Sequence, residues 1–225
     1  MITRMTPFGS AVWTVDRPLR FMGLEVGTRM TIVQTDGGGL WIASPVALDD
    51  AMREALARLG AIRFVVAPNR FHHLYVGDYA RTEAELLGPP GLLEKRRDVD
   101  WTRSIDTRAV WSGGDIVATR VGGMPVLDEL VFFHRPSRTL IATDLLMNWA
   151  PQGRWLTDAA LWLEGVTGTP GVPRLFRFFG VRDRAALRDS LEEILAWNFD
   201  RLIVTHGDNV AKGAKDLVAR AFGRL

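Results

Sequence analysis

The sequence predicts an α/β domain in which two β-sheets pack face to face with helices outside. Three observations predict this. The chain has 225 residues, which suits one large domain better than two. Two β-rich blocks occur along it, and helical segments follow each of them. Hydrophobic residues make up 47% of the chain and charged residues 24%, which is enough apolar material for a large core.

The first β-rich block contains short apolar segments bounded by glycine and proline. Strands are expected at Ala11–Val15, Thr31–Thr35 and Leu40–Ala43, with a hairpin turn at Asp36-Gly37 between the last two. A helix capped by Asp49 or Asp50 should then run to Leu59, because its apolar residues recur at helical spacing. A buried strand at Phe64–Ala67 completes this block.

The second block repeats the pattern with different turns. Gly113-Gly114 should join strands 109–111 and 116–121, and Pro136-Ser137 should join strands 130–133 and 139–143. Asp183 is expected to cap a helix, residues 202–205 to form a strand, and a last helix to begin near Asp208 or Asn209.

Bulk properties exclude several kinds of chemistry and partner. The chain has no cysteine, so disulfides, thiolate nucleophiles and cysteine-bound zinc are excluded. A net charge of +2 gives no field that would recruit nucleic acid. The N-terminal residues lack the apolar core of a signal peptide, and no apolar run reaches the length of a membrane span. We therefore expect a cytoplasmic protein with no membrane span.

Three strands are each followed at once by residues suited to metal or proton chemistry. Residues 64–67 lead to Asn69, His72 and His73, residues 140–143 lead to Asp144, and residues 202–205 lead to His206 and Asp208. Sites in α/β proteins form beyond the carboxyl ends of strands. Imidazoles with a carboxylate suit zinc, iron or manganese. Taken singly, Asp144 could instead cap a turn and His206 could bond to backbone.

The order and spacing of these segments resemble the metallo-β-lactamase superfamily, whose pattern is T-H-x-H-x-D-H, a later G-H, a strand-end Asp and a last His. The segment FFHRPSRTLIATDLLMN resembles an uncharacterised branch, a domain of unknown function. The resemblance covers nearly all of residues 1–225 and implies one domain with a four-layer αββα sandwich. It implies that Asp144 is the metal-bridging aspartate and that His206 is the final histidine ligand.

This sequence departs from the superfamily pattern at several ligand positions. Asn69 stands near the first histidine position and Phe71 near the second, and Gly122-Gly123 replaces the G-H pair. At most one metal is therefore expected, on His73, Asp144 and His206. His72 or Asp208 would move the proton. Glu129 would line the site as a hydrogen-bonding neighbour of a ligand, although a solvated carboxylate at a strand edge is the more common explanation for such a residue. His134 should bond to Ser137 instead of joining the site.

Two functions follow from this interpretation. The first is a metal-dependent hydrolase with one divalent ion and a small-molecule substrate. The second is a metal-free binding or scaffold protein that kept the fold after losing catalysis. The Trp- and Phe-rich segment 149–179 is interpreted first as core or as the surface of a homodimer, then as a lid over the site, and last as a contact with an anionic lipid surface.

Overall fold

The computed structural model describes residues 4–21 and 23–225 and contains two main β-sheets. The larger sheet has the strand order β1-β2-β5-β6-β7-β8-β9. Its strands are Thr6–Pro7 (β1), Val12–Arg17 (β2), Thr28–Gln34 (β5), Leu40–Ala43 (β6), Ile62–Val66 (β7), Glu85–Gly88 (β8) and Arg103–Ser104 (β9). Strands β6, β7, β8 and β9 run parallel. The short strands Arg20–Phe21 (β3) and Leu24–Glu25 (β4) pair separately.

The second sheet has the order β10-β11-β12-β13-β14. Its strands are Arg108–Trp111 (β10), Ile116–Arg120 (β11), Leu130–His134 (β12), Thr139–Ala142 (β13) and Arg201–Val204 (β14). The first three neighbouring pairs are antiparallel, and β13 and β14 are parallel. Because β13 and β14 run the same way, the segments that follow them, with Asp144 and His206, leave the same edge of the sheet.

A central core joins the inner faces of the two sheets. Trp41 of β6 contacts Phe132 of β12 edge to face, with ring centroids 4.9 Å apart. The same cluster takes Val12 and Val33 from the larger sheet and Ile203 from the smaller one. Alternate residues of each strand point into this core, so their neighbours on the outer faces need cover from helices.

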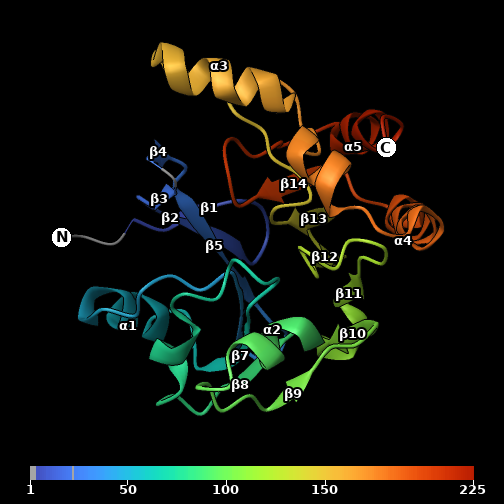
Figure 1. The fold of residues 1–225 in the computed structure, drawn as a ribbon. Helices are drawn as coiled ribbons and strands as arrows, with labels where there is room; N and C mark the ends of the chain where they lie inside the picture. Colours follow the sequence, from blue (N-terminus) through green and yellow to red (C-terminus); the bar gives the residue numbers. More distant parts are fainter. Residues whose placement is uncertain (1–3, 22) are drawn as a thin grey trace.

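Helices supply that cover on both outer faces (Figure 1). The helices are Asp50–Ala57 (α1), Pro90–Lys95 (α2), Trp155–Glu164 (α3), Arg184–Ala196 (α4) and Ala214–Phe222 (α5), with short helical turns at Val76–Tyr79 (η1), Ser112–Gly114 (η2) and Phe176–Gly180 (η3). Helices α1 and α2 bury Met52, Leu56 and Leu92 against the larger sheet. Helices α4 and α5 bury Leu191 and Val218 against the smaller one. The αββα sandwich predicted from the sequence is confirmed.

Local signals placed most elements correctly. Asp49 caps α1 by accepting a hydrogen bond from Met52 N at 2.7 Å, and Asp183 caps α4. His134 Nδ1 lies 2.7 Å from Ser137 Oγ, as predicted. The last helix begins later than expected, at Ala214, because the backbone of Val210 pairs with that of Leu202 and holds the preceding segment against β14.

Among the described residues, no helix combines the length and the apolar character that crossing a bilayer requires.

Candidate metal centre

Three side chains from three separate strand ends meet in one cluster. His72 follows β7, Asp144 follows β13 and His206 follows β14. The Nε2 atoms of the two histidines lie 3.0 Å apart. His72 Nε2 is 3.4 Å from Asp144 Oδ2, and His206 Nε2 is 3.4 Å from Asp144 Oδ1. Within the described part of the chain, these three residues form a cluster that could hold a metal ion. One ligand atom from each residue lies within 4.8 Å of the other two.

The ring of His206 is fixed by a backbone carbonyl. Its Nδ1 lies 3.1 Å from Val26 O, and because a carbonyl only accepts, the proton resides on Nδ1. In the neutral imidazole, Nε2 therefore presents a lone pair to the cluster. Trp149 stacks against the ring at a centroid distance of 6.2 Å and an interplanar angle of 15°. A hydrogen bond from the second ring nitrogen to a backbone carbonyl is the arrangement that orients metal-binding histidines in proteins.

The ring of His72 is held by a side-chain hydroxyl, which can donate to it or accept from it. Its Nδ1 lies 3.0 Å from Ser44 Oγ, and Ser44 directly follows β6, the neighbour of β7 in the larger sheet. The backbone N–H of His72 donates to Asn69 Oδ1 at 2.9 Å. The loop after β7 is thereby fixed with Nε2 of His72 aimed at Asp144 and His206.

Asp144 is an anion at the centre of the cluster. Burial alone would raise the pKa of Asp144, but the charge of His72 and the hydrogen bonds from His206 and His72 lower it below its usual value. Burial would lower the pKa of His206, but the hydrogen bond and charge of Asp144 outweigh it and raise that pKa. The carboxylate therefore favours a cation next to it, either a proton or a metal ion.

Glu129 lies beneath this carboxylate and positions it. Its side chain accepts hydrogen bonds from the backbone N–H groups of Thr143 at 2.8 Å, Asp144 at 2.9 Å and Leu145 at 3.0 Å. Burial, followed by the charge of Asp144, raises the pKa of Glu129 to about 8. Glu129 is buried and not a solvated edge carboxylate, and its hydrogen bonds fix the backbone that carries Asp144.

Asn69 fills the space between the two carboxyl groups. Its Nδ2 donates to Asp144 Oδ2 at 2.7 Å and to Glu129 Oε2 at 3.1 Å. Its Oδ1 accepts from the N–H groups of Phe71 and His72. This network fixes the orientation of the amide, since the reversed amide would face both carboxyl groups with its oxygen. Asn69 therefore presents a donor, which is unsuited to bind a metal ion, where the superfamily pattern has a histidine.

A cavity of about 720 Å³ leads to the cluster. His72, Asp144 and His206 contribute to its lining, together with His73, Lys95 and many apolar side chains. Part of the Trp- and Phe-rich segment 149–179 is core, because Trp149 and Leu161 are buried together with Val166. Another part forms the cavity wall, at Leu175, Phe176 and Phe179.

Comparisons with known proteins agree on the architecture. No protein-family model matches the sequence, and no curated protein matches it. Solved structures do match over almost the entire chain. The DIM-1 metallo-β-lactamase is 13% identical, with a TM-score of 0.67 and coverage of 98% of this chain and 99% of that one. The chain has the metallo-β-lactamase fold.

Two further solved structures support the metallo-β-lactamase fold. The metallo-β-lactamase from Erythrobacter litoralis is 12% identical, with a TM-score of 0.69 and coverage of 98% and 96% of the two chains. The one from Pontibacter korlensis is 14% identical, with a TM-score of 0.65 and coverage of 98% and 97%. At this level of identity the likeness concerns the fold.

The two adjacent histidines lie in different places from those predicted from the sequence. His73 was expected to bind the metal and His72 to move the proton. Arg96 Nη1 lies 2.8 Å from His73 Nδ1, and because a guanidinium only donates, Nδ1 of His73 is an acceptor and its proton is on Nε2. Burial, then Lys95 and Arg96, lower the pKa of His73 to about 4. The structure thus brings His72, not His73, into the cluster.

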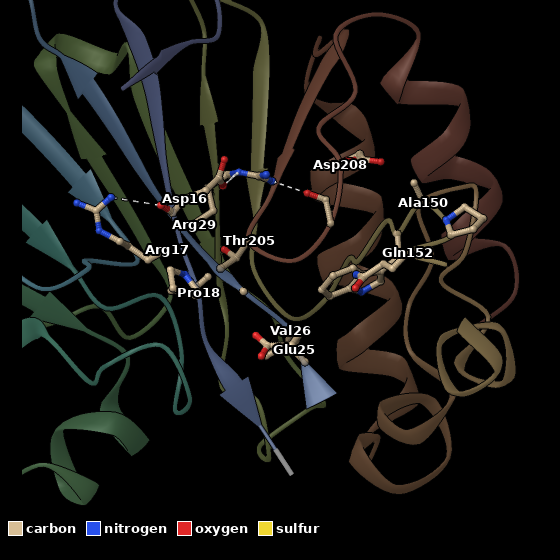
Figure 2. A pocket seen from close by; sticks show the side chains of 15 residues that line it. Asp16, Arg17, Pro18, Glu25, Val26, Arg29, Ala150, Gln152, Thr205 and Asp208 are labelled. Atoms are coloured by element: carbon tan, nitrogen blue, oxygen red, sulfur yellow. Dashed lines mark hydrogen bonds and ion pairs between the residues drawn. The ribbon is translucent and has the colours of Figure 1, made fainter. Parts of the chain in front are cut away.

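Asp208 also lies outside the cavity. It is exposed and lines a separate pocket of about 400 Å³ with Asp16, Arg29 and Gln152 (Figure 2). Its backbone N–H donates to Asn148 O at 2.5 Å. Arg29, which lines the same pocket, donates to Val204 O and Gly207 O. The proton-transfer role predicted for Asp208 is therefore not supported by its position.

The glycine pair that replaces the G-H motif leaves no room for a side chain. Gly123 has φ +75°, and a Cβ built there would meet Asp183 O at 1.9 Å. The N–H groups of Arg182 and Asp183 both donate to Gly123 O, so the start of α4 is packed directly on this glycine. A side chain at position 123 would therefore require α4 to move.

Proposed function

We propose that this protein is a metal-dependent hydrolase with one divalent ion held by His72, Asp144 and His206. The observation that carries the proposal is the spacing of the three ligand groups. A tetrahedral ion with bonds of 2.0–2.1 Å places neighbouring ligand atoms about 3.3 Å apart. The distances among the two Nε2 atoms and the Asp144 oxygens are 3.0, 3.4 and 3.4 Å. Each histidine approaches a different oxygen of Asp144, and one ligand atom from each residue lies within 4.8 Å of the other two, so the donor set and its spacing suit zinc, iron(II) or manganese.

The donor set also leaves a place for chemistry. Three protein ligands are typical of catalytic zinc sites, in which the ion lowers the pKa of a water molecule and polarises the bond to be cleaved. Asp144 supplies the negative charge, and Glu129 and Asn69 keep it in position. His73 lines the same cavity and carries its proton on Nε2, so we assign to it a hydrogen bond to the substrate.

A metal-free binding protein is the second candidate, and Asn69 is the observation that favours it. Its Nδ2 already satisfies Asp144 Oδ2 at 2.7 Å. Because the pKa of His206 is raised, a proton shared between His206 and His72 could replace the ion. In that case the apolar cavity would bind a small molecule without hydrolysing it.

Metal content separates the two candidates. Protein purified without chelators is analysed for zinc, iron and manganese, before and after dialysis against zinc. We expect one ion per chain in the wild type and none in Asp144→Asn, because a neutral amide is a poor zinc ligand. His134→Asn is the control, since His134 is buried but bonds to Ser137, and it should keep the ion. Wild-type protein that takes up no metal under any condition would contradict the hydrolase proposal.

A further inference from the structure

The cavity that leads to the cluster has an apolar wall made from two segments far apart in the sequence. Phe71 comes from the loop after β7, and Phe176 and Phe179 come from η3. The rings of Phe71 and Phe176 lie 6.3 Å apart, so the two segments meet beside the cluster. The volume of the cavity, about 720 Å³, is within the range of small-molecule sites in proteins.

The side chains of this wall are apolar and exposed, and they adjoin one cavity. Leu175 is 54% exposed, Phe179 is 68% exposed and Phe71 is 40% exposed, and all three line the cavity. Exposed apolar area that continues into a cavity is stabilised when an apolar ligand covers it. His72, Asp144 and His206 line the same cavity, so one ligand can contact both these polar groups and the apolar wall.

We propose that the site takes an amphiphilic small molecule with a polar group at one end and an apolar chain at the other. The polar group of the molecule lies at His72, Asp144 and His206, and its chain lies against Phe71, Leu175 and Phe179. The hydrolysis of such a molecule rests on the proposed function, but binding of its apolar chain depends on the apolar wall of the cavity alone.

Isothermal titration calorimetry of the complete chain with straight-chain carboxylates, from butanoate to decanoate, tests this proposal. The titrations are made below the micelle concentration of each probe, with chelator-treated and with zinc-loaded protein. Each added methylene should raise the affinity about threefold to fourfold, as expected for its burial. An affinity that is independent of chain length in both preparations would overturn the proposal.

Neighbouring phenylalanines provide a matched pair of variants. Phe178 and Phe179 are 71% and 68% exposed, but only Phe179 lines the cavity. Phe179→Asp should weaken decanoate binding roughly tenfold, equivalent to the loss of about two buried methylenes, while Phe178→Asp should change it less than about twofold. Equal effects of the two variants would show that the probe binds a general apolar surface and would overturn the proposal.

A second pair covers the case in which Phe179→Asp fails to fold. Leu175 and Leu163 are 54% and 58% exposed, and only Leu175 lines the cavity. Leu175→Asp should weaken decanoate binding, and Leu163→Asp should not. Circular dichroism checks that each variant is folded.

The outcome also separates this inference from the proposed function. Chain-length dependence in protein that binds no metal would support the apolar-chain site and contradict the hydrolase. Tight zinc binding without chain-length dependence would leave the hydrolase standing and overturn the apolar-chain site.

Discussion

The Nε2 atoms of His72 and His206 lie 3.0 Å apart, although 134 positions separate the two residues in the chain. Val26 O fixes the proton of His206 on Nδ1, so its Nε2 lone pair faces His72. His72 can meet this lone pair with a proton on its own Nε2, because the Ser44 hydroxyl can donate to its Nδ1. Alternatively, both Nε2 lone pairs can bind one metal ion. Which of the two, a proton or a metal ion, lies between the rings decides between the two proposed functions.

Zinc binding should depend on His72 and not on His73. At a hundredfold excess over Kd, zinc should stabilise the folded wild type by about 2.7 kcal/mol, which raises Tm by roughly 5–10 °C for a chain of this size. His72→Ala and His206→Ala should abolish the increase, and His73→Ala should retain most of it, because Arg96 occupies Nδ1 of His73. Differential scanning calorimetry with zinc or chelator measures these shifts. The opposite result for the two histidines would restore His73 as the ligand.

Asn69→Asp should make the fold dependent on metal. The substitution keeps the oxygen that accepts from the N–H groups of Phe71 and His72. It replaces the donor Nδ2 by an oxygen, so that a third carboxyl group lies beside those of Asp144 and Glu129. In chelator we expect a loss of roughly 2–4 kcal/mol from unsatisfied and repelling buried groups. Zinc should recover more stability in the variant than in the wild type. Urea unfolding curves test this, and a variant whose stability is indifferent to zinc would argue against a cation site here.

We expect no useful β-lactam hydrolysis. Asn69 directs a donor into the cluster, Phe71 stands at a histidine position, and Gly123 has no room for a side chain beside Asp183. The fold is shared with metallo-β-lactamases, but the proposed site has ligands for one ion only. A nitrocefin assay with added zinc measures the activity directly. Turnover as fast as that of a true lactamase would show that a second metal position survives.

His134 should make stability fall in mild acid. Burial lowers the pKa of His134 in the folded chain below its usual value of 6.5. Below that value the unfolded chain binds the proton more readily than the folded one, so the free energy of unfolding falls as pH decreases through this range. His134→Asn removes this contribution. Urea unfolding between pH 8 and pH 5 should show a gap between the two proteins that changes with pH, and a constant gap would contradict the assignment.

The homodimer predicted from the sequence would use the outward face of α3. Its exposed residues are Trp155, Leu156, Ala159, Trp162 and Leu163, and at 100° per residue they occupy about 120° of the helix surface. Size-exclusion chromatography with light scattering should show a dimer that Trp162→Asp dissociates. Val110→Asp is the control, because Val110 is 60% exposed but lies on β10. A wild type that stays monomeric at every concentration would contradict the prediction.

The sequence by itself determined the layers of the fold and the strand ends that carry the site. Turn residues, helix caps and apolar periodicity act over a few positions, so they are readable locally, as Asp49 and Asp183 show at the starts of α1 and α4. Asp144 and His206 follow parallel neighbouring strands, and that topology brings their side chains together. The helix start near Asp208 was wrong because pairing of Val210 with Leu202 depends on a contact that local patterns do not contain.

Only the tertiary structure decided which of two adjacent histidines joins the cluster. His72 and His73 have the same chemistry and neighbouring positions, so the choice rests on partners distant in the chain, Ser44 for His72 and Arg96 for His73. The same holds for the aromatic segment, in which Trp149 is buried while Trp155 is 77% exposed. Aromatic residues at helical spacing favour burial, but burial requires another element to cover them. Within the described chain, none covers the outer face of α3.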